Sequence, residues 1–206
     1  MAGNKITEEF HERKLLVVEG KDDRNFLEKL IDHLNIQGTE IRDVEGKDNF
    51  NVVLPDLSLI ENFPNLSHFA VIRDKNGDDA FKSICNILKE KMGFSNIPNE
   101  NGKFVPGTPS MGIFIMPGET VKGSKLEDLC LKTVEDHPAM QCVKEFESCF
   151  KKLDNPPKNI SKAKALAFLA AQPDSPATVG LGAQKKYWNL NSPALDELKQ
   201  FLNHLR

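Results

Sequence analysis

Apolar side chains along this chain follow two alternating patterns. Short continuous runs, such as K-L-L-V-V at Lys14–Val18, are typical of strands buried on both faces of a sheet. Between these runs, apolar residues recur every three or four positions, as one face of a helix requires. The alternation predicts a parallel sheet with helices on its faces. The predicted strands are Lys14–Val18, Ile41–Val44, His68–Arg73 and Met111–Met116.

The same spacing predicts a helix after each strand and further helices through the C-terminal part of the chain. Residues 93–110, rich in Asn, Pro and Gly, are predicted to form a surface loop. The fold class is therefore α/β, with a parallel sheet of about four strands flanked by helices over residues 1–136 and a helical C-terminal extension, residues 137–206, packed on it. The predicted helices are Asp22–Leu34, Asn49–Ile60, Asp79–Met92, Lys125–Val134, Ala139–Leu153, Ser161–Ala171 and Pro193–Leu205.

Composition and charge narrow the classes of partner. The 206 residues suffice for one domain with a modest extension and a buried core. A formal net charge of −3 argues against a strongly basic nucleic-acid binder but leaves a local binding surface open, as it does a protein partner or a homo-oligomer. No apolar run is long enough to cross a membrane, and residues 1–10 lack a signal-peptide core, so a cytoplasmic location is expected.

The cysteines do not form a metal-binding pattern. Cys85, Cys130, Cys142 and Cys149 contain no C-x-x-C pair and have no histidine pair at zinc-finger spacing. Cys142 and Cys149 are seven residues apart, which places them on one face of a helix. All are predicted to be buried free thiols in a reducing compartment.

Acidic residues gather where the predicted strands end. In open parallel sheets, ligands bind at the carboxyl ends of the strands. Carboxylates collected at one edge repel one another unless a cation lies among them, and oxygen ligands select hard ions such as Mg²⁺ or Mn²⁺. The sequence therefore predicts a divalent-metal site and assigns no residue to an organic cofactor. The acidic clusters are Glu19 with Asp22 and Asp23, Glu45 with Asp48, Asp74 with Asp78 and Asp79, and Glu119 with Glu127 and Asp128.

The stretch L-L-V-V-E-G-K-D-D-R-N-F-L at Leu15–Leu27 resembles the first motif of Toprim domains, a fold shared by topoisomerases, bacterial primases, OLD-type nucleases and small recombination-mediator proteins. The resemblance implies that Glu19 is the family's invariant glutamate, and the second acidic residue of OLD-type members falls on Asp23. The family's second motif is a strand ending in Asp-x-Asp, and here the strand F-A-V-I-R-D ends at Asp74. Its second acidic position is Asn76, which offers a carbonyl oxygen but no charge, so metal affinity is expected to fall.

A closer similarity, to small stand-alone Toprim-like proteins of uncharacterised function, extends over nearly the whole chain. It includes G-S-K-L-E-D-L at Gly123–Leu129 and the pattern Y-W-N-L-N-S-P-A-L-D-E-L-K-Q-F-L at Tyr187–Leu202. The resemblance to OLD-type nucleases also implies a lysine before a late helix that assists phosphoryl chemistry. Lys162 is the best match and Lys164 the next, and Asp78 can compensate for the charge absent from the Asp-x-Asp motif.

Most of these residues also have a structural interpretation. Asp78 and Asp79 stand where a helix N-cap is expected. Glu127 and Asp128 fit the first turn of a helix, whose dipole favours acidic side chains, although Glu127 would also face the metal site. Trp188 follows K-K-Y, a combination that can bind single-stranded nucleic acid, but core packing is the favoured interpretation.

The pentapeptide V-E-G-K-D occurs twice, at Val18–Asp22 and at Val44–Asp48. Both copies are expected at strand-to-helix turns, which need a glycine and a polar start. In the second copy, Glu45 and Asp48 are expected to be solvated rather than part of the metal site.

The favoured function is a metal-dependent, nuclease-type hydrolase of nucleic acid phosphodiesters that uses Mg²⁺ or Mn²⁺. Glu19 and Lys162 are assigned to catalysis. A catalytically degenerate Toprim-like binding module is the alternative, favoured by Asn76 and the acidic charge balance. A phosphatase or nucleotide-binding enzyme ranks lower, because no D-x-D-x-T motif follows an early strand. The residues assigned to the metal are Glu19, Asp23, Asp74, Asn76, Asp78 and Glu127.

Overall fold

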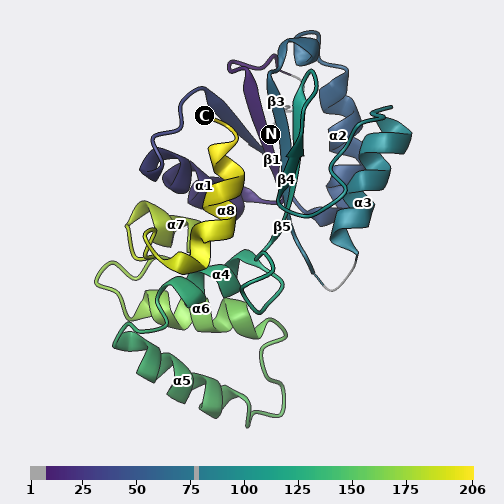
Figure 1. Ribbon diagram of the computed structural model, residues 1–206. Coiled ribbons are helices and arrows are strands. Elements are labelled where there is room, and N and C mark those ends of the chain that lie inside the picture. The colour runs from purple at the N-terminus through teal and green to yellow at the C-terminus, as the bar shows by residue number, and fades with distance from the viewer. Residues whose placement is uncertain (1–7, 77–78) are drawn as a thin grey trace.

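The computed structural model describes residues 8–76 and 79–206 (Figure 1). One five-stranded sheet in the order β2-β1-β3-β5-β4 forms its centre. The first four strands in that order are mutually parallel, and β4 pairs antiparallel with β5 at one edge. This confirms the predicted α/β class and all four predicted strands. The strands are β1 (Lys14–Val18), β2 (Thr39–Asp43), β3 (His68–Asp74), β4 (Lys103–Val105) and β5 (Ser110–Met116).

Helices cover the sheet and make up most of the C-terminal part. A π-helical turn, Ile87–Lys91, continues α3, and short 3-10 turns precede α2 and α8. Within the described residues, no helix is both long and apolar enough to cross a membrane. The helices are α1 (Lys21–His33), α2 (Phe50–Ser58), α3 (Ala80–Asn86), α4 (Leu126–Thr133), α5 (Ala139–Phe150), α6 (Ile160–Ala170), α7 (Val179–Gln184) and α8 (Asp196–Asn203).

Two elements were not predicted. Strand β4 lies inside the segment 93–110 that was expected to be a loop, and its three residues are too few to show an alternating pattern. Its Phe104 ring occupies the space above Gly112 of β5, where a Cβ atom added to the glycine would lie 2.4 Å from the ring. Helix α7 was missed because its sequence V-G-L-G-A-Q is short and holds two glycines, which are poor helix formers.

The two faces of the sheet bury separate hydrophobic clusters, because alternate residues of a strand point to opposite faces. Leu16 and Val18 of β1 belong to the cluster that includes α1 and the C-terminal helices. Leu15 and Val17 belong to the cluster that includes α2 and α3. In Figure 1, α1 and α8 accordingly lie on one side of the sheet, and α2 and α3 lie on the other.

The C-terminal helices share a core with the first helix. Phe168 of α6 and Phe201 of α8 are buried in the same cluster as Phe26 of α1. Trp188 stacks on Phe168 with ring centroids 5.1 Å apart, and its Nε1–H donates to the Val179 carbonyl at 2.9 Å. The core interpretation of Trp188 is therefore confirmed.

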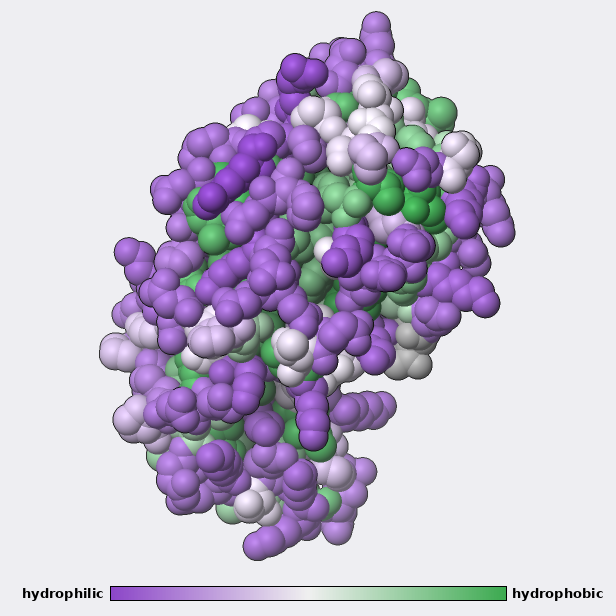
Figure 2. Space-filling view, viewed as in Figure 1, coloured by the Kyte–Doolittle hydropathy of each residue, from purple (hydrophilic) through white to green (hydrophobic). Residues whose placement is uncertain are grey.

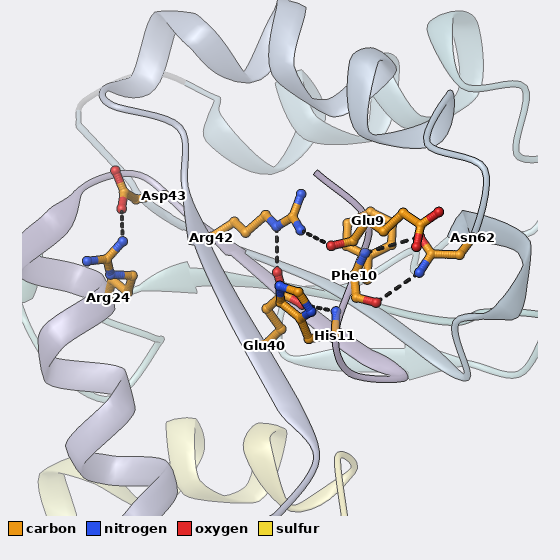
Figure 3. A network of polar contacts seen from close by, with 8 residues as sticks. All are labelled: Glu9, Phe10, His11, Arg24, Glu40, Arg42, Asp43 and Asn62. Carbon is orange, nitrogen blue, oxygen red and sulfur yellow. Dashed lines mark hydrogen bonds and ion pairs between the residues drawn. The ribbon is translucent and has the colours of Figure 1, made fainter. Parts of the chain in front are cut away.

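The N-terminal segment is pinned beside the edge strand β2 (Figure 3). The Glu40 carboxylate accepts from the His11 backbone N–H at 2.8 Å and from Arg42 Nε at 2.7 Å. The Asn62 side-chain amide makes two hydrogen bonds with the backbone of Phe10: it accepts from the N–H and donates to the carbonyl. These contacts hold the N-terminal segment against side chains of the edge strand and of the turn after α2.

The cysteine prediction is only partly right. Cys130 is buried and Cys85 is half-buried, but Cys142 and Cys149 are exposed free thiols on α5. Burial was wrong for this pair because helix α6 covers a neighbouring stripe of α5, which includes Val143 and Phe150.

Candidate metal centre

Glu19 follows the last residue of β1, where the buried strand meets the start of α1. Both oxygens of its carboxylate accept from Asn76 Nδ2, at 3.3 and 3.2 Å. Burial raises the pKa of Glu19, and this rise is opposed by the positive charges of Arg73 and Lys125 and by the backbone N–H of Asp74. The strand end thus holds this carboxylate in a partly desolvated, mixed electrostatic environment.

Asp23 lies in the first turn of α1, one helical turn after Glu19. Its carboxylate accepts from the Gly20 backbone N–H at 2.9 Å, so it caps the helix. It is only 8% exposed. Burial, then the negative charges of Glu19 and Glu127, raise the pKa of Asp23 to about 7 from its ordinary value of 3.8.

Asp74 is the last residue of β3, the strand beside β1. Its Oδ1 accepts from the Leu126 backbone N–H at 3.0 Å, which ties the end of β3 to the first turn of α4. Burial and the charges of Asp23, Glu19 and Glu127 raise the pKa of Asp74 well above its usual range.

These carboxylates come from the end of β1, from α1 and from β3, and they lie at the carboxyl edge of the sheet. The chain runs from β1 to β2 on one side and returns to β3 on the other, so the strand order reverses between β1 and β3. Such a switch point is where open α/β sheets bind ligands. Glu127, in the first turn of α4, completes the acidic group because its charge acts on both Asp23 and Asp74. We call Glu19, Asp23, Asp74 and Glu127 the carboxylate cluster.

Asn76 belongs to this edge but presents its amide in an unexpected way. Its backbone is left-handed, with φ 48°, a conformation that Asn tolerates better than most residues. Its backbone N–H donates to the Ser124 carbonyl at 3.3 Å. Its side-chain N–H groups, rather than its carbonyl oxygen, face Glu19. As a metal ligand, Asn76 would have to turn its amide over.

Two cations at the site were not predicted from the sequence. Arg73, within β3, is 4% exposed, and Lys125 stands at the N-cap of α4. Both positive charges lower the pKa of Glu19. An arginine directly after the apolar run F-A-V-I was the available signal, because a charged residue in a buried strand needs a partner.

Other acidic candidates have structural roles. Asp79 caps α3 through the Lys82 backbone N–H at 3.1 Å, and Asp22 accepts from the Gly180 backbone N–H at 3.1 Å, which joins α1 to α7. Asp128 accepts from the Ser124 backbone N–H at 2.9 Å and from the Ser161 hydroxyl, which joins α4 to α6.

Four further candidates have surroundings of their own, and one lies outside the described residues. Glu45 and Asp48 are exposed, as expected. Lys162 is exposed in the first turn of α6, beside the Ser161 contact. Lys164 instead pairs with Glu147 at 2.8 Å. Asp78 lies outside the described residues.

The donor chemistry fits a hard divalent cation, because carboxylate oxygens dominate the cluster. Over residues 8–76 and 79–206, however, no three His, Cys, Asp or Glu side chains stand close enough together to hold an ion. Hydrogen bonds explain why the carboxylates stay apart. The Glu19 carboxylate accepts from the Asn76 amide, and those of Asp23 and Asp74 accept from the backbone N–H groups of Gly20 and Leu126. The side chains would therefore have to turn inward to bind a metal.

Comparisons with known proteins point to a family and to no activity. No curated protein matches this chain. Among solved structures, it is similar to the crystal structure of the hypothetical protein PH0156 from Pyrococcus horikoshii OT3, with 17% identity, a TM-score of 0.46 and coverage of 93% of this chain and 94% of that one. A family described as "Protein of unknown function (DUF3226)" matches residues 13–206. The chain therefore belongs to the DUF3226 family.

Proposed function

We propose that this protein is a Toprim-like, divalent-metal-dependent hydrolase of nucleic acid phosphodiesters. One observation carries the proposal: four carboxylates lie near enough at the switch point of the sheet for their charges to act on one another, and burial and this repulsion raise the pKa of Asp23 and Asp74. Buried carboxylates that repel one another are stabilised by a cation placed among them. A site built from oxygen donors alone favours Mg²⁺ or Mn²⁺ over softer ions.

The residues would divide the work by position. Glu19 and Asp74, at the ends of adjacent strands, would hold the ion, with Asp23 and Glu127 adding charge. When bound, such an ion polarises a phosphoryl oxygen and activates water. Lys125, whose charge already acts on Glu19, and Lys162, exposed at the start of α6, would bind the phosphate oxygens of the substrate.

The test is cleavage of single- and double-stranded DNA and RNA in the presence of Mg²⁺ or Mn²⁺. Glu19→Gln keeps the shape and removes the charge, so it is expected to abolish cleavage. The matched control is Glu45→Gln, because Glu45 occupies the same position in the second V-E-G-K-D copy but is exposed. Cleavage that survives Glu19→Gln, or that Glu45→Gln reduces equally, would refute the assignment.

A second candidate function is a metal-free binding module. The amide of Asn76 favours it, because this amide offers donors to Glu19 where a Toprim aspartate would offer a further negative charge. Calorimetric titration with Mn²⁺ and Mg²⁺ separates the two functions. Saturable binding that Glu19→Gln removes supports the hydrolase, whereas no heat of binding at millimolar ion supports the module.

A further inference from the structure

The hairpin of α5 and α6 leaves apolar side chains in solvent. Within the described residues, six large hydrophobic side chains are exposed, and three of these, Phe146, Leu153 and Ile160, belong to this hairpin. Phe146 is 47% exposed and Leu153 is 58% exposed. Figure 2 shows hydrophobic (green) groups among hydrophilic ones at the lower end of the molecule, where α5 and α6 lie in Figure 1. Exposed apolar groups that gather in one place mark a contact surface, whereas single ones need no explanation.

The exposed apolar residues of α5 and of the turn after it, together with the half-buried Ala139, follow the repeat of a two-helix seam. Successive members are three, four, three and four residues apart, which is the a/d spacing of paired helices. The two thiols among them are exposed, and a thiol packs as a small apolar side chain. We call this strip the α5 seam. It consists of Ala139, Cys142, Phe146, Cys149 and Leu153.

The seam is the uncovered half of a wider apolar face. Met140, Val143 and Phe150 form the neighbouring stripe of α5 and are buried. Helix α6 packs on that side, where Glu147 of α5 also pairs with Lys164 of α6. The Phe146 ring rests edge-on against Phe150 with centroids 5.2 Å apart, so the seam continues the buried face without a polar break.

The charged residues beside the α5 seam can form ion pairs with the same residues of a second copy. Glu145 is exposed on α5, and Lys152 is exposed in the turn that follows the helix. The Lys151 and Lys152 backbone N–H groups still donate to the Glu147 and Cys149 carbonyls, so the helical path continues and places Lys152 on the same flank as Glu145, facing away from α6. They are seven residues apart and opposite in sign. When two copies of α5 pair antiparallel about a twofold axis, each Glu145 lies beside Lys152 of the other copy, and the same contact forms twice. Charges at such flanking positions set the partner and the orientation of paired helices.

We propose that a second copy of this chain covers the α5 seam, forming a twofold antiparallel homodimer through α5. The self-complementary flank favours a second copy over an unrelated partner, because one helix supplies both halves of each ion pair. In the dimer, Phe146 of each copy packs against Cys149 of the other. This inference does not depend on the metal centre.

Sedimentation equilibrium under reducing conditions tests the dimer. The wild-type protein is expected to dimerise, and Phe146→Glu is expected to be monomeric with an unchanged circular dichroism spectrum, since Phe146 is not needed in the core. The matched control is Leu59→Glu after α2, which places the same charge at a side chain that is 82% exposed. A wild-type monomer up to millimolar concentration, or association lost under reduction, overturns the proposal.

A charge swap tests the partner and the orientation. Glu145→Lys and Lys152→Glu each place like charges in contact, so each is expected to weaken self-association by on the order of tenfold. Mixing the two single variants restores both ion pairs in a mixed dimer, and the double variant restores them in one chain. If neither the mixture nor the double variant regains affinity, the antiparallel α5 contact is wrong.

Discussion

Burial divides the acidic residues of this chain into two kinds. Asp23 and Asp74 are each 8% exposed, and the pKa of both is raised because desolvation and neighbouring carboxylates disfavour the charged form. Asp43, at the end of β2, instead pairs with Arg24 at 3.0 Å, and Glu45 is exposed to water. The first kind gains most from a bound cation, and with the half-buried Glu19 and Glu127 it would carry the proposed chemistry.

The raised pKa of Asp23 should make the stability of the folded protein depend on pH. Its pKa is raised from 3.8 to about 7, so its contribution to folding is fully present below about pH 4 and is lost as the pH rises to about 7. Asp23→Asn mimics the protonated form and keeps an acceptor for Gly20. Relative to wild type, it is expected to be more stable by a few kcal/mol at pH 8 and nearly equal at pH 4. Urea unfolding at the two pH values measures this difference, and an equal effect at both would contradict it.

Asn76 is expected to limit metal affinity. Asn76→Asp removes the amide donors from Glu19 and adds a carboxylate to the cluster. Metal affinity should rise by on the order of tenfold, about 1.4 kcal/mol, while the metal-free protein becomes less stable. Calorimetric titration with Mn²⁺ measures the affinity. Asn51→Asp, which adds the same charge at an exposed position on α2, should leave it unchanged.

Two glycines of α7 are required by close packing between helices, although their spacing resembles a ligand-binding motif. Gly180 and Gly182 of α7 form a G-x-G pattern, and in the fold both are packing positions. A Cβ at Gly180 would lie 2.8 Å from Asn25, and one at Gly182 would lie 2.7 Å from Leu169. Glycine therefore allows α7 to approach α1 and α6. Sequence spacing could not show this, since the neighbours are far away along the chain.

Gly182→Ala should destabilise the protein. The added methyl group would also lie 2.9 Å from Trp188, so the core around α7 must shift, at a cost of about 1–3 kcal/mol. Chemical denaturation measures the free energy of unfolding. Leu181→Ala, at the neighbouring position of the same helix where the side chain is 40% exposed, should change stability by less than about 0.5 kcal/mol. Similar losses for the two variants would argue against close packing at Gly182.

Over the whole molecule, the two faces of the sheet pack against different sets of helices. One cluster joins β1 and α1 to helices as late as α8, so the carboxylate edge is held by residues from both ends of the chain. The other face packs α2 and α3 against the same strands. An ion bound at the edge would therefore stabilise the folded molecule as a unit, since the unfolded chain does not assemble the site.

Thermal unfolding should then respond to divalent ions. At 100 times the dissociation constant, Mn²⁺ or Mg²⁺ is expected to stabilise the fold by about 2.7 kcal/mol. At one fixed ion concentration, the gain should be larger at pH 8 than at pH 5, because protonation of Asp23 competes with the ion below about pH 7 and weakens its binding. Differential scanning calorimetry of wild type and Glu19→Gln measures the effect. An equal gain in Glu19→Gln would mean that the ion binds elsewhere.

The sequence pattern of apolar and polar residues determined the central sheet and the positions of two acidic residues at its edge. The apolar runs predicted four strands and their parallel arrangement, because a buried strand leaves a continuous apolar signature. The same reasoning placed Glu19 and Asp74 at strand ends, and adjacent parallel strands bring such ends together. Strand β4 and helix α7 were beyond this reasoning, because both are short and owe their stability to distant contacts with Phe201 and α1.

The two copies of V-E-G-K-D show what only the tertiary structure decided. In the first, Gly20 is extended with φ −148° and Glu19 joins the carboxylate cluster. In the second, Glu45 and Gly46 have positive φ, and Glu45 is exposed. The Gly46 backbone N–H donates to the Glu19 carbonyl at 2.8 Å, so one copy supports the other. Identical residues take opposite roles because β1 lies between β2 and β3, whereas β2 lies at the edge of the sheet, and neighbours on both sides are what bury a strand end.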